Sequence, residues 1–304
     1  MKKYFALFLM TIAVTQAQEV KVTSGKVVRF PNFKSQFVDA RNVDVWLPDG
    51  YSDKQQYAVL YMHDGQMLFD PETTWNKQSW ELDATAGQLI ADKKTQPFIV
   101  VGIWNNNLKR HQEYFPQKPF ESLDDSQRKF VSDILLQQHK IDTELNPISD
   151  DYLKFLVGEL KPFIDKTFAT KADQSHTFIA GSSMGGLISM YAVCEYPKVF
   201  GGAACLSTHW TGIYQVVDNP VPDAFFAYMK QQLPSPKRHK LYFDCGDKTL
   251  DALYPTLQQK TDLILESKGY TDKNLMSKFF AGKDHSEAAW RERLDIPLQF
   301  LMGK

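Results

Sequence analysis

Residues 180–186 read Ala-Gly-Ser-Ser-Met-Gly-Gly, and the other elements of the chain are interpreted around this segment. They contain G-x-S-x-G with Ser183 at its centre. An apolar run at 177–180 enters the motif, and a helix-like stretch at 187–193 leaves it. A strand, a tight turn and a helix form the context that the nucleophile-elbow motif requires. The helix N-terminus would offer free N–H groups to a developing oxyanion. The plainer alternative is a glycine-rich turn whose serine only caps the helix.

Alternating strands and helices surround this motif. Helical spacing predicts a closing helix over 287–302, interrupted at Pro297, and a helix over 79–94 capped by Ser79. Residues 105–150 and 209–238 lack periodicity and are interpreted as two excursions, which in a compact domain are usually functional. Strands are predicted at 27–30, 43–48, 57–62, 97–104, 177–180, 199–207, 241–246 and 278–282, and further helices at 151–168, 187–193 and 247–267.

This order of elements predicts an α/β fold with a mostly parallel central sheet and helices on both faces, opened by an antiparallel pair at 26–48. The length of 304 residues and the apolar content of 43% suit one large domain over residues 18–304. The net charge is -1, from Lys+Arg 35 against Asp+Glu 36, so no basic excess indicates a nucleic-acid partner.

The first 17 residues have the pattern of a secretory signal peptide. Lys2-Lys3 precede an apolar stretch at 4–14, and Thr15-Gln16-Ala17 offers small residues for cleavage before Gln18. The apolar stretch is short for a membrane span, so we expect no stable membrane anchor. The pattern predicts a secreted or periplasmic protein, and a retained anchor is the alternative.

Three cysteines, Cys194, Cys205 and Cys245, lie in apolar segments. An odd number gives no disulfide framework, and buried free thiols are expected. Neither Cys-x-x-Cys nor His-x-x-x-His occurs. The sequence therefore indicates neither a metal site nor a cofactor.

A nucleophilic Ser183 needs a base, which in α/β-hydrolases follows it in the chain. Three histidines do so. His239 precedes a predicted strand and belongs at the wrong end of the sheet. His209 follows a strand, but no well-placed acid lies between it and Ser183. His285 follows the last strand and is favoured, although its polar neighbours also fit a surface loop.

The acid of such a triad is expected just beyond the strand that ends at Gly246. Asp247 and Asp251 both qualify. Asp247 would equally serve as a helix N-cap, and Asp251 as an ordinary acid in the first helical turn. Asp244 lies within the strand and is less well placed. Position alone leaves the choice between Asp247 and Asp251 open.

The oxyanion hole needs two backbone N–H donors. One is expected from Met184, the residue after the nucleophile. The other is expected from the loop that follows the strand at 57–62, where Gly65 permits a close turn and Gln66 is the best donor. A plain turn is the alternative reading of this loop.

Several of these segments together resemble the esterase family of α/β-hydrolases, which includes esterase D, feruloyl and acetylxylan esterases and enterochelin esterase-like proteins. The resemblance covers roughly residues 40–302. The matching segments are 59–66 with 68–70, 100–103, 181–186, 243–246 with Leu250-Asp251, and His285-Ser286-Glu287 with Trp290.

By resemblance, Ser183 is the nucleophile, His285 the base and Asp251 the better acid. The Asp247-Lys248 pair departs from the threonine-glutamate expected there, which keeps Asp247 as the alternative acid. The expected activity is a serine carboxylic ester hydrolase acting on acyl esters of carbohydrates or on siderophore-like esters. An acyltransferase and a catalytically silent binding protein on the same scaffold are the alternatives. Trp75, Trp80, Trp104 and Trp210 favour a carbohydrate.

Overall fold

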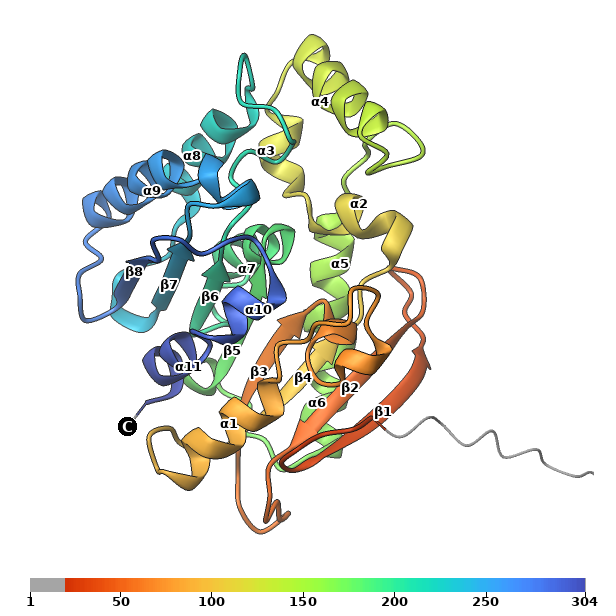
Figure 1. Ribbon diagram of the computed structural model, residues 1–304, viewed down its shortest axis with the longest axis vertical. Coiled ribbons are helices and arrows are strands. Elements are labelled where there is room, and N and C mark those ends of the chain that lie inside the picture. The colour runs from red at the N-terminus through yellow and green to blue at the C-terminus, as the bar shows by residue number, and fades with distance from the viewer. Residues whose placement is uncertain (1–19, 304) are drawn as a thin grey trace, which may run out of the picture.

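The computed structural model describes residues 20–303, so the predicted signal peptide at 1–17 lies outside the described residues. Its centre is an eight-stranded sheet in the order β1-β2-β4-β3-β5-β6-β7-β8 (Figure 1). The pairs β1–β2 and β2–β4 are antiparallel, and all later pairs are parallel. The strands are β1 Lys26–Phe33, β2 Arg41–Leu47, β3 Ala58–His63, β4 Phe98–Ile103, β5 Thr177–Ser182, β6 Gly202–Leu206, β7 Lys240–Cys245 and β8 Leu275–Phe279.

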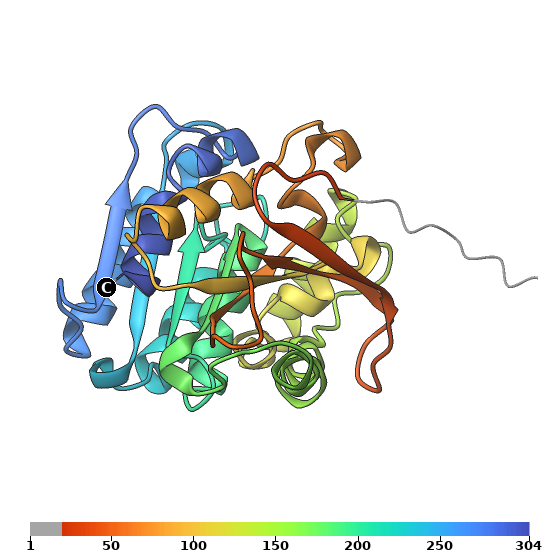
Figure 2. The ribbon, with the colours of Figure 1, turned by 90° about the horizontal axis from the view of Figure 1, so that it is seen from below.

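Helices cover both faces of this sheet (Figure 2). Successive strand residues point to opposite faces, so Leu60 of β3 packs into one core cluster and Tyr61 into the other. The Leu60 side is covered by α1 (Leu82–Ala91) and α11 (Asp295–Met302). The Tyr61 side is covered by α5 (Ser149–Phe155), α6 (Lys161–Thr167), α7 (Met184–Glu195), α8 (Val221–Gln232) and α9 (Pro255–Ser267). The predicted α/β fold with a mostly parallel sheet is confirmed.

Several element boundaries differ from the prediction: the helix predicted at 247–267 starts only at Pro255, and the strand predicted at 278–282 is Leu275–Phe279. The closing helix breaks at residues 292–294, between α10 (Glu287–Arg291) and α11, and not at Pro297. Pro297 lies in the first turn of α11, where its missing N–H costs no intrahelical bond. Ser79 is not the cap of α1, which begins after Glu81. The Ser79 hydroxyl instead donates to the carbonyl oxygen of Phe69.

Both excursions contain helices that the sequence analysis did not predict. Residues 105–150 form α2 (Arg110–Tyr114), α3 (Gln117–Glu121) and α4 (Asp125–Gln137), and α8 lies in the second excursion. A capping box between Asp124 and Gln127 begins α4. That spacing was a readable signal for a helix start. Helices α2 and α3 have only five residues each, which is too short for apolar residues to repeat at the helical period.

The first excursion is fixed to the sheet by a buried ion pair. Arg41 of β2 donates from Nη1 and Nη2 to the two carboxylate oxygens of Glu113 in α2, at 2.8 and 2.6 Å. The two side chains are only 2% and 0% exposed. Arg41 also lies over the rings of Tyr152 and Phe155 in α5. One guanidinium thus holds β2, α2 and α5 together.

No helix within residues 20–303 is both long and apolar enough to cross a bilayer. The three cysteines are free and buried, as predicted.

Replacing Arg41 with methionine should lower the free energy of unfolding by about 3–5 kcal/mol, because the Glu113 carboxylate would remain buried without its cation. Urea denaturation of the two proteins measures the difference. The double variant Arg41→Met/Glu113→Leu removes both charges and should recover most of the loss. A double variant no more stable than Arg41→Met would contradict this account.

Candidate active site

Ser183 lies in a strained turn between β5 and α7. Its backbone has φ 57° and ψ −122°, a conformation that costs energy for a residue with a side chain. The Ser183 N–H donates to the Leu206 carbonyl at 2.9 Å. A Cβ on Gly181 would lie 2.8 Å from the backbone of Gly185, and one on Gly186 2.9 Å from Thr208. The small residues of the motif are therefore required by close packing.

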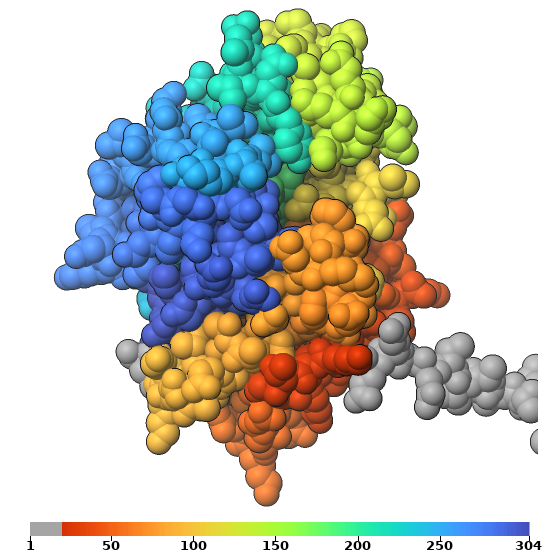
Figure 3. All heavy atoms as spheres, viewed as in Figure 1, coloured from red at the N-terminus to blue at the C-terminus, as the bar shows by residue number. Residues whose placement is uncertain are grey.

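The turn opens into a cleft at the carboxyl ends of the parallel strands. The cleft has a volume of about 700 Å³, and both Ser183 and His285 line it. Its walls come from residues 64–80, 105–110, 139–140, 214, 250 and 285–290. Figure 3 shows these segments, distant in the sequence, meeting around a hollow on one face of the molecule. Ser183 is 8% exposed, as expected at the floor of a cleft.

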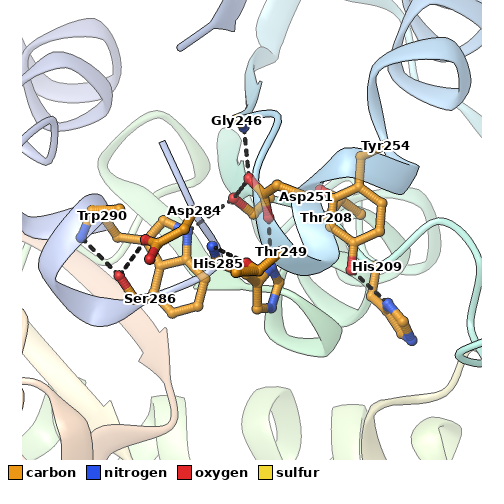
Figure 4. A network of polar contacts seen from close by, with 12 residues as sticks. Thr208, His209, Gly246, Thr249, Asp251, Tyr254, Asp284, His285, Ser286 and Trp290 are labelled. Carbon is orange, nitrogen blue, oxygen red and sulfur yellow. Dashed lines mark hydrogen bonds and ion pairs between the residues drawn. The ribbon is translucent and has the colours of Figure 1, made fainter. Parts of the chain in front are cut away.

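His285 and Asp251 are in direct contact (Figure 4), and His285 lines the same cleft as Ser183. The distance from His285 Nδ1 to Asp251 Oδ1 is 2.6 Å, and Asp251 is fully buried. Asp251 Oδ2 accepts hydrogen bonds from the Gly246 N–H at 2.6 Å and the Ser207 hydroxyl at 2.7 Å.

These contacts determine the charge of Asp251. Burial raises the pKa of its carboxyl, but the hydrogen bond and charge of His285 and the donors Ser207 and Gly246 outweigh burial and lower it below its usual range. Asp251 is therefore ionised at neutral pH. It accepts the Nδ1 proton of His285, which leaves Nε2 of the neutral ring with a free lone pair.

Asp247, the other candidate acid, lies in a different set of contacts. Its Oδ1 accepts the Gly282 N–H at 2.7 Å, and its own N–H, like that of Lys248, donates to the Lys283 carbonyl at 3.0 Å. The Thr249 hydroxyl accepts the His285 N–H at 3.0 Å. Asp247 thus braces the loop after β7 against the loop that carries His285. Asp251, and not Asp247, lies against the imidazole.

His209, the second candidate base, lies at the same edge of the sheet but is fully buried. Its Nδ1 is 2.7 Å from the hydroxyl of Tyr254, and its Nε2 has no hydrogen-bond partner among residues 20–303. Burial, and the cations nearby, lower the pKa of His209 well below its usual value. An imidazole whose protonated form is this unfavourable, and which has no carboxylate partner to stabilise it, is poorly suited to take up a proton as base. The Tyr254 phenol also lies beside the Ser183 hydroxyl.

The two predicted oxyanion donors lie at helix starts. Gln66 is the second residue of a short 3-10 helix, Gly65–Met67, and lines the cleft. Met184 is the first residue of α7. The N–H groups of a first helical turn have no partner within the helix, so both positions can donate to a ligand.

Sequence reasoning missed the groups that hold the Gln66 loop. Asp64, in a left-handed conformation at φ 56°, accepts two hydrogen bonds from Arg110, at 2.8 and 2.7 Å, and one from Asn105 at 2.6 Å. Asp64 lies close to the elbow, since a Cβ added to Gly185 would be 3.5 Å from the Asp64 Oδ2 atom. The Arg110 guanidinium thereby balances the charge of the Asp64 carboxylate next to the elbow. The two residues are 46 positions apart in the sequence, so no local motif indicated that they would pair.

The tryptophans that favoured a carbohydrate lie in different environments. Trp75 is 85% exposed at the cleft, and Trp80, buried, also lines it. The rings of Trp80 and Trp290 are stacked, with their centroids 5.3 Å apart. The Trp290 ring meets the His285 ring edge to face, with a centroid distance of 4.9 Å. Trp210 is fully buried in the core. Trp104 donates to Asp44 away from the cleft lining.

Within residues 20–303, no three His, Cys, Asp or Glu side chains cluster in a way that would hold a metal ion.

Comparisons with known proteins give the family. Residues 35–301 match the esterase family described as "Putative esterase". The endo-1,4-beta-xylanase/feruloyl esterase of Xylanibacter ruminicola is 29% identical over 275 residues, which cover 86% of this chain and 29% of that protein. This chain therefore spans less than a third of that relative's length.

Solved structures share the fold. A ferulic acid esterase superposes with a TM-score of 0.64 at 18% identity, over 91% of this chain and 98% of its own. The enterobactin esterase of Shigella flexneri superposes with a TM-score of 0.62 at 15% identity, over 93% of this chain and 61% of its own. The family match covers strands β2 to β8, the elbow and the cleft, and the chain belongs to this esterase family of carboxylic ester hydrolases with the α/β-hydrolase fold.

Proposed function

We propose that the chain hydrolyses its ester through a triad of Ser183, His285 and Asp251 and a covalent acyl-enzyme. The observation that carries the proposal is the 2.6 Å contact between His285 and Asp251 in the cleft that Ser183 lines. The strained backbone of Ser183 supports it, because such strain is kept mainly at functional sites.

In this mechanism, Ser183 Oγ attacks the ester carbonyl carbon while His285 Nε2 takes its proton. The Asp251 carboxylate keeps the ring oriented and stabilises the imidazolium that forms. Backbone N–H groups of Gln66 and Met184 bind the oxyanion. His285 then gives the proton to the leaving alcohol, and water, activated by the same ring, releases the acid and regenerates Ser183.

For the substrate, we propose an acyl ester of a carbohydrate, with a siderophore-like ester as the alternative. The exposed indole of Trp75 at the cleft favours the first, since a flat aromatic face suits the apolar face of a sugar ring. The xylanase/feruloyl esterase relative points the same way, and the enterobactin esterase fold relative supports the alternative.

Replacing Ser183 with alanine should reduce ester turnover by at least about 10⁴-fold, because no other group in the mechanism can form the acyl-enzyme. A panel of feruloyl, acetyl-xylan and catecholate-siderophore esters, assayed with both proteins, measures this and ranks the substrates. Product analysis with excess sugar acceptor separates hydrolysis from acyl transfer. Turnover retained by Ser183→Ala would refute the nucleophile.

The two candidate acids should respond very differently to the same change. Asp251→Asn should lower kcat by about 10³–10⁴-fold, because an amide stabilises neither the required tautomer nor the imidazolium. Asp247→Asn is the matched control and should stay close to the parent, since its amide oxygen can still accept the Gly282 N–H. Thermal melts of both variants monitor folding. A comparable loss in Asp247→Asn would reopen the choice of acid.

We further propose export, supported by the basic, apolar and small-residue pattern of residues 1–17. Expression of the full chain in a bacterial host should yield a periplasmic or secreted form whose N-terminal sequence starts at Gln18. Recovery of the uncleaved chain with the membrane fraction would instead support a retained anchor.

A further inference from the structure

The hydroxyl of Ser207, which follows β6, has three polar neighbours. It lies 2.7 Å from Asp251 Oδ2, 2.9 Å from Nε1 of Trp290 and 3.1 Å from Nη2 of Arg293. All four residues are buried. The sequence separations of 44, 83 and 86 residues explain why no motif revealed this cluster.

The chemistry of these neighbours fixes the direction of each hydrogen bond. An indole N–H and a guanidinium only donate, so Trp290 and Arg293 occupy both lone pairs of the Ser207 oxygen. The single hydroxyl hydrogen is then left for Asp251, whose ionised carboxylate only accepts. A serine hydroxyl normally rotates between partners, and here one orientation alone satisfies every group.

We propose that Ser207 is a positioning residue of the esterase, a hydroxyl locked by Trp290 and Arg293 so that it donates to Asp251 and sets the orientation of the acid beside His285. This inference rests on the proposed triad. With Oδ2 held by Ser207 and the Gly246 N–H, only Oδ1 remains for the imidazole.

Arg293, one of the two donors to Ser207, is itself held in place by an ion pair. Arg293 donates from Nε and Nη2 to the two oxygens of Asp244, at 3.1 and 3.0 Å, and is 3% exposed. The Ser207 N–H lies 2.9 Å from the Asp244 carbonyl and 3.1 Å from its Oδ1. Ser207 has φ 42°, a left-handed conformation that is unfavourable for serine and is held by these contacts.

The bond from Ser207 should also affect the pH dependence of the enzyme. A carboxylate accepts the hydroxyl hydrogen more strongly when its imidazole partner is neutral than when the partner is charged, because the imidazolium withdraws its electron density. Ser207 therefore favours the neutral ring of His285, which is the form that acts as base. Its removal should move the acid limb of the rate profile to higher pH.

Other titratable groups face this cluster from each surrounding element. Burial raises the pKa of the Cys245 thiol to about 12 and that of the Tyr254 phenol well above its usual value, so neither is ionised near neutral pH. His209 is neutral, since burial lowers its pKa well below the usual value. Burial raises the pKa of the Asp244 carboxyl, and its two bonds from Arg293 oppose this.

The test is the pH profile of kcat/KM for an activated ester, compared between the parent and Ser207→Ala. In Ser207→Ala we expect the plateau value of kcat/KM to fall about tenfold, as for the loss of one hydrogen bond to a charged group. The acid limb of the profile should move to higher pH by about half a pH unit. Trp290→Phe keeps the ring beside His285 and removes only one donor to Ser207. It should give a smaller shift in the same direction.

Ser132→Ala is the matched control, because Ser132 is also buried and makes its hydrogen bond to the Leu145 N–H, away from the cleft. It should leave the profile unchanged. A lower plateau with an unmoved acid limb in Ser207→Ala, or a limb moved to lower pH, would overturn the inference. If Ser207→Ala does not fold, the limb in Trp290→Phe decides in the same way. An inactive parent, or an active Ser183→Ala, would instead overturn the proposed triad.

Discussion

The geometry of the site follows from the strained backbone turn at Ser183. A backbone at φ 57° and ψ −122° lifts one side chain above the sheet edge, and it survives only because the surrounding packing leaves no alternative. Gly181 lets β5 approach α7, and Gly186 lets α7 approach the end of β6, more closely than a side chain at either position would permit. The parallel sheet then brings the loops after β3, β5, β6, β7 and β8 to the same edge.

The outer walls of the cleft come from segments that are not part of the sheet. The first excursion reaches the cleft through Arg110 and is anchored beneath by Arg41 and Glu113. In this excursion, the Arg41–Glu113 pair contributes to stability, and the Arg110–Asp64 pair holds the loop that carries Gln66.

Most of the fold was readable from the sequence, because buried parallel strands and the elbow leave strong local patterns. The position of His285 after the last strand was equally readable. Position in the chain left the choice between Asp247 and Asp251 open, since both follow β7 within one short loop, and only the family resemblance favoured Asp251. The path of that loop brings Asp251 to the imidazole. Helices α2 and α3 were missed because each has only five residues, whereas α4 was missed although its capping box at Asp124 and Gln127 was visible in the sequence. Ser207, Trp290 and Arg293 meet only through tertiary packing, so no spacing between residues in the sequence could have predicted their contact.

The loops after β7 and β8 are tied to each other by backbone bonds to Lys283 and by the side chains of Asp247 and Thr249. Two segments joined in this way cannot open separately, so a local fluctuation that displaces the base also displaces the acid. In hydrogen exchange, the amides of both loops would behave as one cooperative unit. Because the base and the acid sit on segments joined in this way, a displacement of either loop would carry both residues of the His285–Asp251 bond together.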